Sequence, residues 1–253
     1  MKMKYTIQYV TSCFLLFCCI FVNAQEEKET QIVDSIQYIQ KYGLRVGTDI
    51  GKLIRTATDD DYSGFEINGD FRLTKKLFVA AEIGVEEKTT TTDFLSSTAN
   101  GSYIKAGVDY NMYTNWLDMT NMIYSGFRVG FSSFSQTRNS YTVYNQSQFW
   151  QPQFTNNQPL EFSGLSSTWL ELIIGIKAEI VTNLFIGLNA QLKSTISNKD
   201  LDNFESLYIP GFNKTSDSGN FGVGYSYTIS YSIPLFKKGK KEAEIEEVKE
   251  EKE

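Results

Sequence analysis

The strongest constraint on the fold of this chain is an alternation of apolar with polar or small residues. It recurs along stretches of about ten residues, the length of a barrel strand. In one stretch Leu172, Ile174 and Ile176 share one face, and Glu171 and Lys177 share the other. A period of two is that of a β-strand with two different faces. The alternation occurs eight times and predicts strands at 42–52, 64–73, 77–86, 102–112, 123–133, 168–180, 184–196 and 221–235.

The two faces of these stretches differ sharply in charge. The apolar faces carry no charged residue in their central spans, whereas the opposite faces collect both signs. An Arg or Lys that faced lipid at the bilayer midplane would cost ~2–4 kcal/mol. We therefore predict that the apolar faces meet lipid and that the charged faces pair inside a barrel. The predicted lumen charge network consists of Arg45, Asp49, Glu66, Asp70, Arg72, Glu82, Lys105, Asp109, Arg128, Glu171, Lys177 and Glu179.

The connections between the predicted strands alternate in length. Those at 74–76 and 181–183 are short and the one through 115–117 is modest, whereas those at 54–63, 87–101, 134–167 and 197–220 are longer. Short periplasmic turns and long outer loops are typical of outer-membrane barrels. The predicted fold is therefore all-β: an eight-stranded antiparallel up-and-down transmembrane β-barrel over residues 42–236.

Alternation alone does not separate this fold from a soluble lipocalin-like barrel. In that alternative the apolar faces point inward around a ligand and the charged faces meet water. The long regular strands, the alternating links and the uncharged apolar faces favour the membrane. The soluble periplasmic ligand-binding barrel stays open as the second interpretation.

The first 24 residues have the composition of a signal peptide. A basic start is followed by an apolar stretch, and Val22-Asn23-Ala24 places small residues ahead of Gln25. All three cysteines lie in this leader, so the mature chain is expected to hold no disulfide or thiolate metal site. We predict export to the cell outer membrane, with a periplasmic lead-in at 25–41 and a charged periplasmic tail at 237–253.

Two runs of sequence resemble a known family. They are YGLRVGTD at 42–49 and DDYSGFEINGDFRL at 60–73, the second followed by KKL at 75–77. The runs resemble an uncharacterised family of small outer-membrane β-barrel proteins, a domain of unknown function, and the likeness extends from Tyr42 to Leu235. The resemblance implies the barrel and its location. It supplies no catalytic or binding residue.

The sequence offers little catalytic chemistry. It has no histidine, which removes Ser-His catalysis and imidazole metal sites. Carboxylate pairs such as Glu82 with Glu86 and Glu171 with Glu179 are explained more simply by pairing with lumen cations. We expect no enzymatic activity, no cofactor and no metal. The formal charge of -6, without a basic patch, also argues against nucleic acid as a partner.

Three further features suggest surface roles. Asp59-Asp60-Asp61 is either a solvated acidic turn or a site that bridges lipopolysaccharide through divalent ions. Aromatic residues of the largest outer loop either clasp a glycan or peptide or pack onto the barrel mouth: Tyr141, Tyr144, Phe149, Trp150 and Phe154. Other aromatic residues are expected to form interfacial girdles: Tyr103, Tyr110, Tyr124, Trp169, Tyr225 and Tyr231.

The function that these observations favour is that of a non-enzymatic outer-membrane barrel with a structural, surface-binding or envelope role. The expected partners are outer-membrane lipid and lipopolysaccharide, the barrel-assembly machinery during biogenesis, and an extracellular glycan or peptide. A small channel is a further alternative, for which charges crowding the lumen predict little conductance.

Overall fold

The computed structural model describes residues 39–113, 120–143, 154–198, 206–214 and 220–239. The predicted signal peptide at 1–24, most of the lead-in and most of the tail lie outside these residues. The first described strand begins at Ile39 and the last ends at Gly239, so the barrel extends slightly beyond both predicted ends, 42 and 236.

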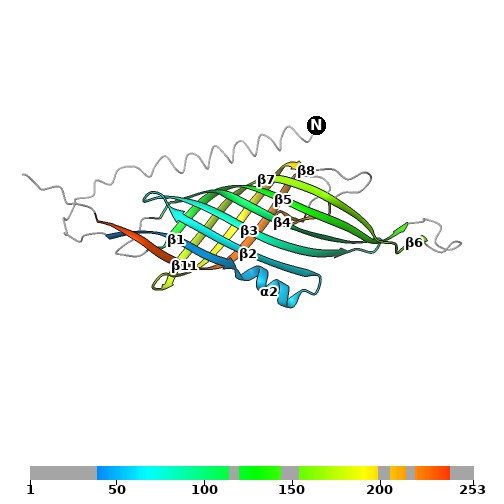
Figure 1. Cartoon of the computed structure of the whole chain (residues 1–253), viewed down its shortest axis with the longest axis horizontal. Helices are drawn as coiled ribbons and strands as arrows, with labels where there is room; N and C mark the ends of the chain where they lie inside the picture. The colour runs from blue at the N-terminus through cyan, green and yellow to red at the C-terminus, as the bar shows by residue number, and fades with distance from the viewer. Residues whose placement is uncertain (1–38, 114–119, 144–153, 199–205, 215–219, 240–253) are drawn as a thin grey trace, which may run out of the picture. The chain divides into compact units, whose positions relative to one another are not determined.

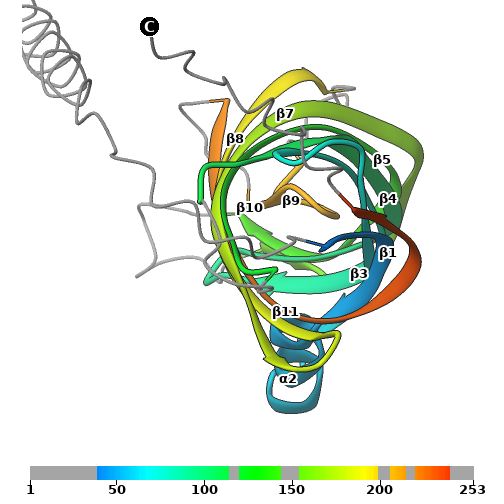
Figure 2. The ribbon, with the colours of Figure 1, turned by 90° about the vertical axis from the view of Figure 1, so that its left-hand side faces the viewer.

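Eight long strands form a closed antiparallel ring, seen from the side in Figure 1 and end-on in Figure 2. Each strand pairs with the next strand along the chain, including β4 with β5, and the pairing of β1 with β11 closes the ring. This confirms the predicted fold class. The strands are β1 (Ile39–Asp49), β2 (Tyr62–Arg72), β3 (Leu77–Thr91), β4 (Leu95–Asn111), β5 (Met122–Val143), β7 (Leu160–Val181), β8 (Leu184–Asn198) and β11 (Phe221–Gly239).

Burial alternates residue by residue along the strands, as the sequence pattern predicts. On β7, Ile174 is 67% exposed, whereas its neighbour Ile173 is 1% exposed. Leu172 and Ile176 also face outward, and Glu171 is buried. The exterior is therefore apolar and the interior charged, which is the arrangement of a transmembrane barrel and the reverse of a lipocalin-like one.

One predicted strand is wrong at its end, because a helix replaces its last residues. The alternation predicts a strand over 42–52, but β1 ends at Asp49 and α2 (Ile50–Thr58) begins. The Asp49 side chain caps the helix by accepting from the backbone N–H groups of Gly51 at 2.8 Å and Lys52 at 3.4 Å. Within the described ranges, no helix has the length and apolarity needed to cross a membrane.

Two predicted long links consist largely of strand. The segment 87–101 extends β3 and β4 into a hairpin that closes through residues 92–94. The segment 134–167 likewise extends β5 and β7, and the short β6 (Phe154–Asn156) pairs with the end of β5. Both strands of each hairpin stay paired through these segments, so the unpaired loops are shorter than the apolar alternation predicts.

Half of the predicted aromatic girdle lies inside the barrel instead. Tyr103, Tyr124 and Trp169 are almost fully buried, whereas Tyr110, Tyr225 and Tyr231 are exposed on the outer surface. Each buried ring covers a glycine directly opposite on the neighbouring strand, and the pairs are Tyr103 with Gly84, Tyr124 with Gly175, and Trp169 with Gly130. The glycines leave the space that lets large rings fill a narrow lumen.

Candidate functional site: a charged lumen with a lateral cleft

The lumen holds stacked groups of ion pairs, and the first lies near the end that carries the short turns. Asp70 accepts from Arg45 Nε at 2.7 Å and from Lys177 Nζ at 2.6 Å. The Arg45 guanidinium lies 5.0 Å from the ring centre of Phe78 and 5.1 Å from that of Phe185. Charge pairing and ring faces together satisfy a buried guanidinium.

A second group lies further along the lumen. Arg128 is paired with Asp109, with Nη1 at 2.7 Å from Oδ1, and its Nε lies 3.6 Å from Glu82. Glu82 in turn accepts from Lys105 Nζ at 2.8 Å. Lys105 is 2% exposed, and its ammonium also lies 3.6 Å from Glu66.

The third group surrounds Glu66, Glu86 and Glu171. Lys52 Nζ lies 2.9 Å from Glu66 and 2.6 Å from Glu86. Lys193 Nζ lies 3.5 Å from Glu171, to which Lys105 is also close, at 3.8 Å. Glu86 and Lys193 lie on the charged faces of the predicted strands, as the alternation indicates, whereas Lys52 was missed because it lies on α2.

The other predicted network residues take different roles. Asp49 caps α2, as described above. Arg72 donates to the backbone oxygens of Thr74 and Lys75 in the turn after β2. Glu179 accepts from the Thr120 hydroxyl at 2.6 Å and the Asn183 backbone N–H at 2.8 Å. Arg72 and Glu179 therefore support the turn end of the barrel.

A small hairpin fills the opposite end of the lumen. Figure 2 shows β9 (Tyr208–Ile209) and β10 (Asn213–Lys214) inside the ring of strands. Glu86 accepts from the Tyr208 hydroxyl at 2.9 Å and from the Gly211 N–H at 2.8 Å. Lys193 donates to the Gly211 carbonyl at 2.7 Å. The hairpin is thus held by lumen charges, and Ile209 packs with a buried group of apolar residues: Tyr103, Phe134, Leu165, Trp169 and Phe212.

The wall of the barrel is interrupted where α2 replaces β1. The pairing of β1 with β11 stops at Asp49 and Thr228, so residues 221–227 of β11 pair only with β8. The facing part of β2 meets the helix instead, because the Thr56 hydroxyl donates to the Gly64 carbonyl at 3.1 Å and accepts from its N–H at 2.9 Å. Figures 1 and 2 both place α2 outside the ring of strands.

A lateral cleft of about 440 Å³ occupies this interruption. Its inner wall is formed by lumen residues such as Glu86 and Lys193, and its outer edge by Ile54 of α2 and by Val223 and Tyr225 of β11. Lys52 belongs to the outer helix, yet it reaches the lumen carboxylates and also contacts the Tyr103 hydroxyl. The cleft therefore connects the charged interior with the lipid-facing exterior.

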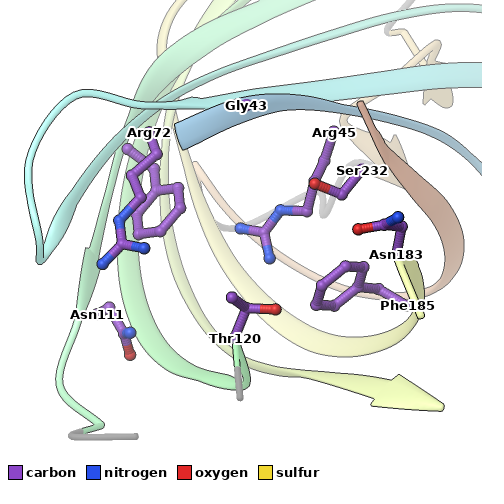
Figure 3. A pocket seen from close by; sticks show the side chains of 9 residues that line it. Gly43, Arg45, Arg72, Asn111, Thr120, Asn183, Phe185 and Ser232 are labelled. Carbon is purple, nitrogen blue, oxygen red and sulfur yellow. The ribbon is translucent and has the colours of Figure 1, made fainter. Parts of the chain in front are cut away.

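A second, much smaller cavity lies at the turn end of the lumen. It measures about 40 Å³, and Arg45, Arg72 and Phe185 are among the side chains around it (Figure 3). Its volume suits water molecules rather than an organic ligand. The lateral cleft is therefore the better candidate for a binding site.

The two predicted surface features are only partly described. Tyr144, Phe149 and Trp150 lie outside the described residues, whereas Tyr141 and Phe154 face each other edge to face with ring centres 6.5 Å apart. In the acidic run, Asp59 is paired with Lys88 at 3.0 Å and Arg55 at 3.3 Å. The hydrogen bond from Lys88 holds the pKa of Asp59 below its usual value. The described part of the chain contains no cluster of three or more metal-ligating side chains.

Three comparisons relate the chain to known proteins. The model of the family described as Domain of unknown function (DUF6048) matches residues 6–238. Among solved structures, the chain is similar to Ail, the attachment invasion locus protein of Yersinia pestis, with a TM-score of 0.39 and 10% sequence identity, over 78% of this chain and 99% of that one. No curated protein matches the sequence.

Proposed function

The chain belongs to the family Domain of unknown function (DUF6048), and we propose that it is a non-enzymatic barrel of the cell outer membrane with a closed lumen and a surface-binding or envelope role. The observation that carries the proposal is the contrast between the two sides of the wall. Ile174 and Val223 represent an exterior of exposed apolar side chains, whereas Lys105 and Glu171 represent an interior of buried, paired charges. An exterior of this kind is stable only against hydrocarbon.

A filled lumen argues against the channel alternative. Ion pairs cross the barrel at successive levels, and the β9–β10 hairpin is bonded to Glu86 and Lys193 near the end opposite the turns. Ions that pass through would have to displace these pairs, and breaking one buried pair costs about 3–5 kcal/mol. The proposed role therefore lies at the surface of the barrel rather than in solute passage.

A surface-binding role is supported by the extended β5–β7 hairpin, which projects beyond the other strands in Figure 1. Tyr141 and Phe154 lie near its end, and Phe154 is 61% exposed. Exposed aromatic faces bind sugars and peptides through stacking and apolar contact. An extracellular glycan or peptide is the ligand class that this proposal names.

Two measurements test the proposed function. Cell envelopes that contain the full chain are fractionated, and the purified protein is run on gels with and without boiling. We expect recovery in the outer-membrane fraction, a heat-dependent shift in migration, and no unitary conductance in planar bilayers. Recovery in the soluble periplasm would refute the location, and stable ion-conducting steps would refute the closed lumen.

The recognition role needs a separate variant. Residues 139–159 are replaced by Asn-Gly, which joins the paired Arg138 and Leu160 through a tight turn. We expect the variant to keep its heat-dependent shift and to lose binding on glycan and peptide arrays. Unchanged binding by a folded variant would exclude this hairpin as the recognition surface.

A further inference from the structure

The lateral cleft has the features of a site for a membrane lipid, an inference that builds on the proposed membrane location. Its volume of about 440 Å³ falls within the roughly 300–1,000 Å³ of small-molecule sites. It lies where β11 lacks a strand partner on one side, between the end of the β1 pairing and Phe221. A molecule in the surrounding leaflet can therefore reach the charged lumen from the side.

The inner wall of the cleft has hydrogen-bond donors to spare. Lys193 is 2% exposed, and among the described residues its ammonium makes one hydrogen bond, to Gly211, and one longer ion-pair contact, to Glu171. An ammonium carries three donors. The neighbouring carboxylate is already saturated, because Glu86 accepts from Lys52, Tyr62, Tyr208 and Gly211.

The cations that line the cleft are paired, so the spare donors of Lys193 carry the argument for an anion. Lys52 is paired with Glu66 and Glu86 in the lining. Lys105 and Arg55 are paired with Glu82 and Asp59, which lie outside it. Lys193, whose ammonium has the fewest close acceptors of the three lysines, therefore favours a ligand rich in anionic oxygen. Phosphate groups supply such oxygens and form strong charge-assisted hydrogen bonds with lysine.

The outer edge of the cleft is apolar and continues the lipid-facing surface. Val223 and Tyr225 are 76% and 75% exposed on the unpaired part of β11. On α2, Ile54 and Leu53 are exposed, and together with Ile50 and Ala57 they follow the spacing of one helical face. Hydrocarbon chains therefore have a continuous surface outside the cleft.

We propose that the cleft binds a phospholipid of the surrounding membrane, with its phosphate beside Lys193 in the lumen and its acyl chains outside against Val223 and Tyr225. The headgroup supplies the acceptors that the inner wall lacks. The acyl chains stay in the bilayer, so only the headgroup leaves its usual environment.

The test measures phospholipid retention by the full chain as purified from envelopes in a neutral alkyl maltoside. Native mass spectrometry follows titration with phosphatidylglycerol or with a diacylglycerol of the same chains. Gln191→Glu adds an anion to the cleft wall without changing the shape of the side chain. Asn189→Asp is the matched control, because Asn189 lies two residues away on the same strand, bonded to Gln191 and outside the cleft.

We expect the wild-type protein to retain phosphatidylglycerol and not diacylglycerol. Gln191→Glu should weaken retention by at least about tenfold, because like charges in a desolvated site cost more than the 1.4 kcal/mol that corresponds to tenfold. Asn189→Asp should bind as the wild type does. Gly224→Ala is a second variant that keeps the charge and narrows the cleft, since an added Cβ would lie 2.9 Å from Gln191 Oε1 and 3.2 Å from Lys193 Nζ.

Several results would overturn the inference. Equal retention of diacylglycerol would show apolar contact alone, and full displacement by glycerol 3-phosphate would show a site for soluble anions. If Gln191→Glu and Gly224→Ala retain phosphatidylglycerol as the control does, the cleft is excluded as the phospholipid site. The heat-dependent gel shift reports folding in each sample, so a folded barrel that retains no phospholipid refutes this inference and leaves the proposed function intact.

Discussion

Replacing Lys105 with methionine tests the ion-paired lumen most directly. The Lys105 side chain is 2% exposed, and its ammonium lies within 4 Å of three carboxylates, those of Glu82, Glu66 and Glu171. Methionine keeps much of the apolar stem and removes the charge. The substitution therefore leaves the buried carboxylates of Glu66 and Glu171 and the partly buried one of Glu82 with fewer partners, and little else changes.

The expected cost follows from the partners that remain. Glu66 keeps Lys52 at 2.9 Å and the Tyr103 hydroxyl at 2.5 Å. Glu171 keeps Trp169 Nε1 at 2.7 Å and Lys193 at 3.5 Å. Among the described residues, Glu82 keeps Arg128 at 3.6 Å. Removing one partner of a buried pair costs about 3–5 kcal/mol, and we expect the lower end because each carboxylate keeps at least one contact. Glu82 faces Lys105 on the neighbouring strand, and Glu171 likewise faces Lys193, so the carboxylates are held by strand pairing beside the site of the lost charge.

Lys177→Met is the matched control near the turn end. The Lys177 side chain is 12% exposed, and its partner Asp70 keeps Arg45 at 2.7 Å. Loss of one charged hydrogen bond there costs about 1.5 kcal/mol. The two free energies of unfolding are measured by urea titration in phosphatidylcholine vesicles, with intrinsic tryptophan fluorescence, to which the lumen residue Trp169 contributes, as a probe.

The difference between the two variants decides the outcome. A clearly larger loss for Lys105→Met is expected from a dry, charge-paired interior. If both variants lose less than about 0.5 kcal/mol, the value typical of exposed ion pairs, the lumen charges are solvated. The closed interior on which the proposed function rests would then be wrong.

Three other predictions follow from single positions. Ile174→Lys places a charge on the lipid-facing side of β7 and should reduce the free energy of unfolding in vesicles by ~2–4 kcal/mol, whereas no loss would remove that face from the bilayer. Thr56→Val removes the paired hydrogen bonds to Gly64, so amide hydrogen exchange at Gly64 should accelerate and the free energy of unfolding should fall by about 1 kcal/mol. Unchanged exchange would argue against the helix covering the edge of β2. The pKa of Asp59 is lowered chiefly by its hydrogen bond from Lys88. The stability that this pairing contributes is therefore present above the unfolded pKa of Asp59 and is lost as pH falls through the folded pKa. Carbon NMR should show the Asp59 pKa rising in Lys88→Ala, and an unmoved pKa would contradict the pairing.

The face of each strand that points away from the lumen was predictable from the sequence, because a charge that faces lipid is so unfavourable. Arg45 and Asp70 fall on the predicted lumen face, and the structure pairs them at 2.7 Å. The alternation does not determine the partners, because facing residues depend on strand register. Lys177 and Asp70 are 107 residues apart in sequence, and nothing local indicates their contact.

The helix was missed because its first residue fits two patterns. Ile50 continues the alternation of β1 and also begins the apolar face of α2. The capping by Asp49, a residue type common at helix starts, was the available signal. Once the helix is recognised, Lys52 is assigned to α2 outside the ring rather than to the predicted strand, and its side chain reaches into the lumen.

The buried aromatic residues were misplaced because aromatic residues suit both the interface and a lumen that has room for them. The deciding signal lies on the neighbouring strand, where Gly130 faces Trp169 and Gly84 faces Tyr103. A ring opposite a glycine in the predicted register indicates the inside of a narrow barrel. This signal requires the register first, which the alternation alone does not supply.

The bonds that hold the β9–β10 hairpin have a consequence for the order of folding. Tyr208 bonds to Glu86 across 122 residues of sequence, and Gly211 bonds to the same carboxylate across 125. Contacts so distant along the chain form slowly, because loop-closure entropy is lost before they contribute. The pairing of β1 with β11 joins residues 179 (Asp49 with Thr228) to 200 (Ile39 with Gly239) positions apart, so closure of the ring is late by the same reasoning. Refolding should therefore pass through a species whose other neighbouring strands are paired while the seam between β1 and β11 is open and the interior is hydrated. Closure of that seam and arrival of the hairpin would form the late kinetic phase.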